Sequence, residues 1–189
     1  MRQLSIGLHL ASVLLALNAF ALTSSAQLQS VSGKLPLKAE LVLSPQLCSA
    51  KTGHYINGDL LSIGKKMCPQ IEAELSDIFS ELKPVDKLPA AGSTSAQVVL
   101  IPKLVDISVT QPLLGSSEQE LLIVMEWTVQ DAAGKTVWLQ TVQGSSHRKR
   151  GWIVTPKRRS ALVEAAAEDL AKASATRMSN ASELRHLAP

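Results

Sequence analysis

The segment Glu120–Gln130 most restricts how this chain can fold, because large apolar residues occupy every second position in it. One side of the segment carries Leu121, Ile123, Met125, Trp127 and Val129. A period of two is typical of a β-strand with one buried face. Asp131–Lys135 predicts a short turn in which Gly134 can adopt positive φ, and Thr136–Gly144 returns as the antiparallel partner. The apolar face of this hairpin needs a covering layer.

Two amphipathic segments can supply that layer. Pro69–Leu82 has an apolar stripe at helical spacing, and Lys83-Pro84 ends it. An alternative start lies near Asp59, with a break at Pro69. The alanine-rich segment from Ser160 to about Ala181 predicts the second helix, with Ser160 as its N-cap.

Two further strands are predicted. Leu35–Leu43 alternates, and Ala96–Gln111 is rich in β-branched residues, although Pro102 requires an edge or a bulge there. The order is β-α-β-β-β-α, in which the first two strands become parallel neighbours and the later strands antiparallel ones. We therefore expect an α+β fold: a two-layer sandwich of a four-stranded mixed sheet with two helices on one face. The domain should span residues 35–181, between a flexible leader, 27–34, and a C-terminal tail, 182–189.

The amino terminus has the pattern of a secretory signal peptide, residues 1–26. Arg2 precedes an apolar run from Leu8 to Leu22, and Ser24 and Ala26 are small residues before Gln27. A transmembrane anchor is the alternative, but spanning takes about 20 apolar residues. After cleavage no further segment is apolar enough to span a membrane. The expected location is periplasmic or secreted.

The two cysteines, Cys48 and Cys68, are predicted to form a disulfide, since export leads to an oxidising compartment. Two free structural thiols are one alternative. A metal site is another, but Cys48, His54 and Cys68 would need a fourth ligand. A catalytic thiol is the last, and it would need a free cysteine beside a base.

A strongly basic segment, His147–Arg159, contains no acidic residue although the whole chain has a net charge of only +3. The candidate residues for an anionic partner are Arg148, Lys149, Arg150, Trp152, Lys157, Arg158 and Arg159. That partner would be an anionic lipid or polymer surface of the envelope, or a protein. The alternative is a solvated loop between the last strand and the last helix. Export and the scarcity of aromatic residues argue against nucleic acid.

Catalysis has little support in the sequence. His54 is the best single candidate, because it lies with Tyr55 and Lys51 in a glycine-bearing loop. No nucleophile elbow and no zinc-helix motif is present, and no metal or cofactor is predicted. We expect a non-enzymatic protein, with an exported hydrolase acting near His54 as the alternative.

Three phrases carry a resemblance to known proteins: AQVVLIPKLVDISV, ELLIVMEWTVQDAAGKTVWLQTVQG and ALVEAAAEDLAKA. With the element order, they resemble bacterial envelope proteins, among them uncharacterised envelope lipoproteins, the curli secretion-channel lipoprotein and the amino-terminal domain of TolB. The resemblance covers about Leu35 to Met178 and implies an exported envelope protein. That group shares no common active site, so no functional residue is carried over. This chain departs from it by lacking a lipid-attachment cysteine, which puts membrane anchoring in doubt.

Overall fold

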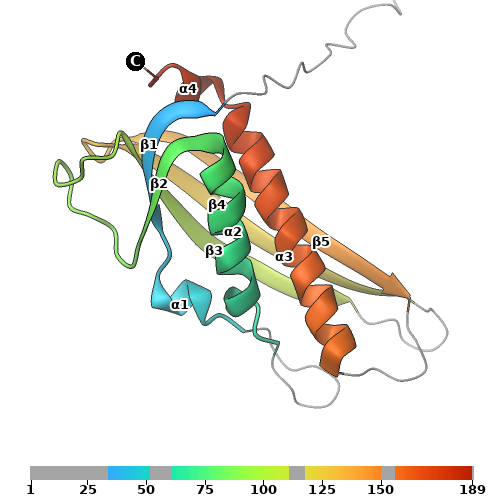
Figure 1. Ribbon diagram of the computed structural model, residues 1–189. Coiled ribbons are helices and arrows are strands. Elements are labelled where there is room, and N and C mark those ends of the chain that lie inside the picture. Colours follow the sequence, from blue (N-terminus) through green and yellow to red (C-terminus); the bar gives the residue numbers. More distant parts are fainter. Residues whose placement is uncertain (1–33, 52–60, 111–117, 150–155, 189) are drawn as a thin grey trace, which may run out of the picture. The chain divides into compact units, whose positions relative to one another are not determined.

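Five strands form one mixed sheet in the part of the chain that the structure describes, and helices α2 and α3 cover one of its faces (Figure 1). The structure is a computed structural model that describes residues 34–51, 61–110, 118–149 and 156–188. These residues belong to one compact unit. The elements are β1 (Leu35–Val42), α1 (Pro45–Cys48), α2 (Gly64–Ile78), β2 (Phe79–Val85), β3 (Val98–Thr110), β4 (Glu118–Asp131), β5 (Thr136–Lys149), α3 (Pro156–Ser179) and α4 (Ser182–Arg185).

The strand order across the sheet is β2-β1-β3-β4-β5. β1 is parallel to both of its neighbours, whereas β3, β4 and β5 are successively antiparallel. The predicted α+β class, the mixed sheet and the β4–β5 hairpin are confirmed. The predicted strand number is wrong, because the described sheet has five strands and the expected one had four.

The missed strand is β2, which follows α2 without a loop. The sequence predicts a helix to Leu82, but the helix ends at Ile78 and Phe79 is already extended, with φ −97° and ψ 149°. Parallel pairing with β1 replaces the helical hydrogen bonds, and the Ser80 hydroxyl also donates to the carbonyl of Leu37 at 2.9 Å. Pro84 is tolerated because β2 is an edge strand.

Helix α2 begins at Gly64 and continues through Pro69. The predicted start at Pro69 and the alternative break there are therefore both wrong. Pro69 cannot donate to the carbonyl of Lys65, which costs the helix one backbone hydrogen bond near its start. Burial of Met67, Ile71 and other apolar side chains against the sheet offsets this loss.

Strand β3 shows how a central strand accommodates Pro102. β1 pairs with β3 only from Val98 to Leu100, so Pro102 lies beyond the end of that ladder. The register with β4 then shifts between Leu104 and Asp106. The expected edge at Pro102 is thus confirmed, because no strand lies on its β1 side within the described pairing.

The core lies between the helices and one face of the sheet. The alternating residues of β4 predicted to face inward are all fully buried: Leu121, Ile123, Met125, Trp127 and Val129. The Trp127 indole N–H donates to the Ser174 hydroxyl at 2.9 Å, and that hydroxyl donates to the carbonyl of Leu170 at 2.8 Å. This buried pair of hydrogen bonds ties the centre of the sheet to α3.

Helix α3 approaches β5 very closely at Gly144. A Cβ atom placed on Gly144 would lie 2.3 Å from the backbone nitrogen of Leu170 and 2.4 Å from its Cβ. Two polar contacts flank this point: the Ser145 N–H donates to Asp169 Oδ2 at 2.8 Å, and the Ser146 hydroxyl donates to the Leu162 carbonyl at 2.7 Å. The helix therefore lies on β5 at a separation that only glycine permits.

Regular structure near the C-terminus extends further than the sequence predicts, in β5, in α3 and in residues 182–188. α3 begins at Pro156, before the predicted cap Ser160, and β5 continues past Gly144 to Lys149. Residues 182–188, expected as a tail, include α4, and Leu184 is fully buried in the core.

Substituting Gly144→Ala should lower the free energy of unfolding by about 3 kcal/mol, because the added methyl group meets helix backbone that cannot move aside. Urea unfolding followed by circular dichroism measures this. The neighbouring exposed change Gln143→Ala is the control and should stay within about 0.5 kcal/mol of the wild type. Equal stability of the two variants would contradict the close approach.

Substituting Ser174→Ala should lower the free energy of unfolding by between about 1 and about 3 kcal/mol, since the buried Trp127 indole loses its acceptor. The exposed substitution Thr176→Ala on the same helix is the matched control and should have little effect. Thermal unfolding followed by tryptophan fluorescence reports both. A neutral Ser174→Ala variant would show that the hydrogen bond does not hold α3 to the sheet.

Candidate functional site

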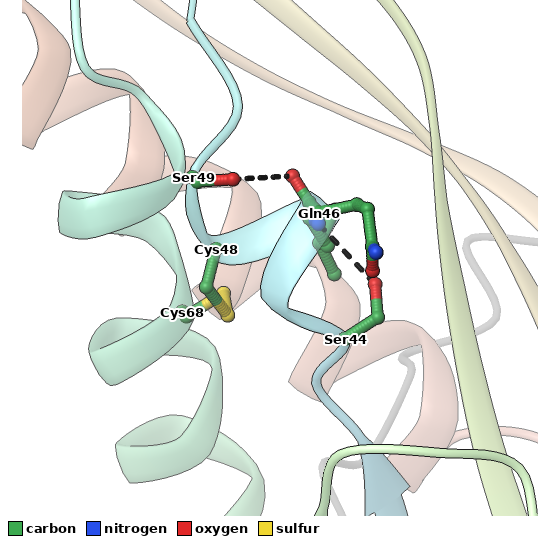
Figure 2. Close-up of a disulfide and its surroundings, with 6 residues drawn as sticks. Ser44, Gln46, Cys48, Ser49 and Cys68 are labelled. Carbon is green, nitrogen blue, oxygen red and sulfur yellow. Dashed lines mark hydrogen bonds between the residues drawn. A yellow bond between two sulfur atoms is a disulfide. The ribbon is translucent and has the colours of Figure 1, made fainter.

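The predicted disulfide is present and joins α1 to α2 (Figure 2). Cys48 ends α1 and Cys68 lies in the second turn of α2, with their Cα atoms 5.7 Å apart. The single turn of α1 is capped by Ser44, whose hydroxyl accepts from the Leu47 N–H at 3.2 Å. A cap of this kind satisfies an otherwise unpaired donor at the helix start, so this very short helix is held in place by the cap and the disulfide together.

Further contacts join the two chain segments just inside the cysteine loop, the stretch between Cys48 and Cys68. Lys51 and Ser62 form an isolated antiparallel bridge, and the Gly64 N–H donates to the Ala50 carbonyl at 3.0 Å. A Cβ on Gly64 would lie 2.2 Å from the Leu47 carbonyl oxygen, so only glycine fits where α2 passes α1. The segment 52–60 therefore leaves and rejoins the fold at neighbouring points. His54 and Tyr55, the sequence candidates for catalysis, lie outside the described residues.

The basic segment is divided between two regular elements. Arg148 and Lys149 are the last two residues of β5, and Lys157, Arg158 and Arg159 lie in the first turn of α3. These five residues thus lie on regular backbone, and their binding of an anionic partner stays a prediction. Arg150 and Trp152 lie outside the described residues.

A second group of cations at this end was not predicted from the sequence. Lys65 and Lys66 lie in the first turn of α2, whose N-terminus is at the same end of the molecule as that of α3 (Figure 1). The Lys66 ammonium donates to Glu164 of α3 at 3.3 Å, which ties the start of α2 to the third turn of α3. Neither helix has an acidic residue in its first turn. Only the packing of α2 on α3 brings these lysines near the basic segment.

The acidic residues at this end lie mainly on β4. Glu118 is the register partner of Lys149, and Glu120 Oε1 lies 3.6 Å from Nε2 of His147. The positive macrodipole ends of α2 and α3 also lie at this end. The described residues thus place more positive than negative charge at this end.

An exposed ion pair elsewhere on the surface shifts the pKa values of both of its members. The hydrogen bond and the charge of Glu81 raise the pKa of Lys38, and the same bond lowers the pKa of Glu81. This pair joins β1 to the edge strand β2 at 2.8 Å. Among the described residues, no group of three or more His, Cys, Asp or Glu could hold a metal ion.

The helices in the described part of the chain all lack the length and apolar character needed to cross a membrane. No protein-family model matches the sequence, and comparison with curated proteins finds no match. The similarity that exists is to solved structures.

Two such structures are bacterial proteins. The minor lipoprotein from Acinetobacter baumannii is 14% identical, with 78% of this chain and 93% of that chain covered and a TM-score of 0.50. Protein XCC0632 from Xanthomonas campestris, of family DUF330, is 9% identical, with coverages of 78% and 86% and a TM-score of 0.53. At identities this low, the structural similarity shows a shared fold alone. The resemblance to envelope lipoproteins is thus confirmed at the level of fold, while that to the curli channel and TolB stays a prediction.

Removing the disulfide by the double substitution Cys48→Ser and Cys68→Ser should lower the free energy of unfolding by about 3 kcal/mol, because a loop of 20 residues is no longer closed in the unfolded chain. Urea unfolding with and without reductant measures it. Reductant should lower the midpoint of the wild type and leave that of the double variant unchanged. A wild-type midpoint insensitive to reductant would show that the bond does not contribute.

Proposed function

We propose that this chain is an exported, non-catalytic protein of the bacterial envelope, and that its basic end binds an anionic surface there. The observation that carries the proposal is the convergence of cations from three elements at one end. Arg148 and Lys149 end β5, Lys157–Arg159 open α3, and Lys65 and Lys66 open α2.

The electrostatic arrangement supports binding of anions. A helix start is stabilised by negative charge and destabilised by positive charge, by roughly 0.3–1 kcal/mol for each group. Both α2 and α3 have cations in that position and no acid in the first turn. Anionic headgroups at this end would relieve the unfavourable interaction. Each Lys or Arg near an anionic surface contributes about 1 kcal/mol of binding free energy.

Export is supported by two features. The sequence begins with the pattern of a signal peptide, residues 1–26, and Cys48 and Cys68 are joined in the structure. Disulfides persist mainly in oxidising compartments such as the periplasm and the extracellular space. A periplasmic or secreted location follows as part of the proposal.

Reversing two cations should weaken binding to anionic vesicles by at least about 30-fold, since two contributions of about 1 kcal/mol are lost. The test compares Arg158→Glu/Arg159→Glu with Lys87→Glu/Lys135→Glu in co-sedimentation with vesicles containing phosphatidylglycerol. Lys135 lies at the opposite end of β5, beside its first residue, and both control lysines are exposed.

The control double variant should lose much less binding, although the change in net charge is the same. Binding of the wild type should fall with added salt and should be absent with zwitterionic vesicles. Equal losses in the two double variants would mean that only net charge matters. Unchanged binding of Arg158→Glu/Arg159→Glu would refute the basic end as the contact surface.

Two other roles stay open beside this proposal. One is a role of the exposed β5 edge in pairing with a protein strand, for which a second copy of this chain is proposed below. An exported hydrolase acting near His54 remains the enzymatic alternative, supported only by the residues of the loop sequence. It predicts that His54→Ala abolishes a hydrolytic activity without changing the melting temperature, and a hydrolase screen on the purified protein would detect that activity.

A further inference from the structure

Strand β5 presents part of its backbone at the edge of the sheet. It pairs with β4 without interruption from Trp138↔Val129 to Lys149↔Glu118. In an antiparallel ladder, alternate residues direct both N–H and C=O toward the partner strand or away from it. The Ser145 N–H points away, because it donates to Asp169 of α3. Residues in the same phase as Ser145 therefore also point outward.

These outward-pointing residues are Leu139, Thr141 and Gln143. All three side chains are exposed, and they lie on the face of the sheet opposite the helices. Leu139 has 58% of its surface exposed, so an apolar side chain lies beside these outward backbone groups. Between Thr136 and Ser146 the strand has no charged residue and no proline. Natural proteins use charged residues and proline to protect a sheet edge, and this stretch of β5 has neither.

The other edge of the sheet provides a contrast within the same molecule. β2 has seven residues, and it contains Glu81, Lys83 and Pro84. Lys38 of β1 also bonds to Glu81 across this edge. Charge and proline thus protect the β2 edge, whereas between Thr136 and Ser146 the described β5 edge is protected only where Asp169 accepts from the Ser145 N–H.

We propose that the β5 edge pairs with β5 of a second copy of this chain, antiparallel and about a two-fold axis at Thr141. The open stretch is bounded by the register irregularity near Thr136 and by the Ser145–Asp169 bond, and Thr141 lies near its middle. In this register Thr141 faces Thr141 of the partner subunit, and Leu139 faces Gln143 of the partner subunit. The three outward residues then make about six backbone hydrogen bonds across the axis.

A second copy fits this edge for two reasons. Identical strands placed antiparallel bring each residue close to its own copy or to a nearby position, so any charge near the axis would meet a like charge. The stretch from Thr136 to Ser146 has none. The open stretch is also symmetric about Thr141, so each copy offers the same donors and acceptors that it requires. This inference is independent of binding at the basic end.

The test is the molar mass of the purified, oxidised protein by sedimentation velocity, up to about 100 μM. The wild type should sediment as a dimer at the highest concentration. Thr141→Pro should be a monomer, because proline removes an outward N–H. The fold should survive, since that N–H is not used in the ladder to β4. Thr141→Val keeps the N–H and should remain dimeric.

A pair of charge variants tests the register itself. Leu139→Lys with Gln143→Lys places like charges opposite each other across the axis and should give a monomer. Leu139→Lys with Gln143→Glu places opposite charges there and should restore a dimer that dissociates with added salt. Circular dichroism and the melting temperature at low concentration should match the wild type in both, as the positions are exposed.

Three results would overturn the proposal. The first is a wild type that remains monomeric at about 100 μM, which would leave a strand from another protein as the occupant of the edge. The second is a dimeric Thr141→Pro variant, which would place the interface elsewhere. The third is equal behaviour of the two charge pairs, which would refute the axis at Thr141.

Discussion

The contact between α3 and β5 determines most of what this molecule exposes. Leu170 lies directly on Gly144, and no side chain larger than hydrogen fits at that position. Asp169 reaches the edge of the strand and accepts from Ser145, while Ser174 accepts from the buried Trp127 indole. A single helix therefore covers the core, holds the centre of the sheet and closes one stretch of its edge.

Several surfaces follow from this placement. The helices occupy one face of the sheet, and Leu139 on the opposite face of β5 is more than half exposed. Between Thr136 and Ser145, the edge of β5 has outward backbone groups and no charged residue. The connection from β5 to α3 places Arg148 and Lys149 at the same end as the first turn of α3. A basic end and an open edge are thus consequences of one packing arrangement.

The disulfide acts at the other helix. It fixes α1 beside the start of α2, where Gly64 allows the two backbones to approach. The disulfide adds to the burial of Leu47, through which the single turn of α1 packs on the core. It also holds the two ends of the cysteine loop close together.

Local patterns in the sequence predicted much of this fold. The alternation in β4, the turn at Gly134, the alanine-rich α3 and the cysteine pair are each encoded by neighbouring residues, and each was predicted. β2 was missed because Phe79 and Leu82 continue the helical stripe of α2, so the period of the sequence favours a longer helix. The pairing of β2 with β1 is a tertiary interaction that overrides this preference. Lys83-Pro84 limits the helix only at Leu82, so it does not mark the observed end at Ile78.

The candidate site also combines features that neighbouring residues encode with features that only tertiary packing creates. The cluster His147–Arg159 is contiguous, so the sequence reveals it. Lys65 and Lys66 join it only because α2 packs beside α3, and Glu164 marks that contact. Nothing in the local pattern indicates that Asp169 protects Ser145, because the two residues belong to different elements. The open stretch of the β5 edge was therefore not predictable from the residues of β5 alone.

The most direct test of the account is amide hydrogen exchange at single-residue resolution, followed by NMR at the lowest practical concentration. Pairing with β4 should protect every second amide of β5 from exchange. The contact with α3 should protect one outward amide in addition. The amides that face β4 should exchange slowly: Gln140, Val142 and Gly144. The amides that face outward should exchange rapidly: Leu139, Thr141 and Gln143. Ser145 also faces outward, but its amide should exchange slowly because its N–H donates a hydrogen bond to Asp169. Rapid exchange at Ser145, or uniform protection along β5 at that concentration, would contradict the arrangement of α3 on this edge.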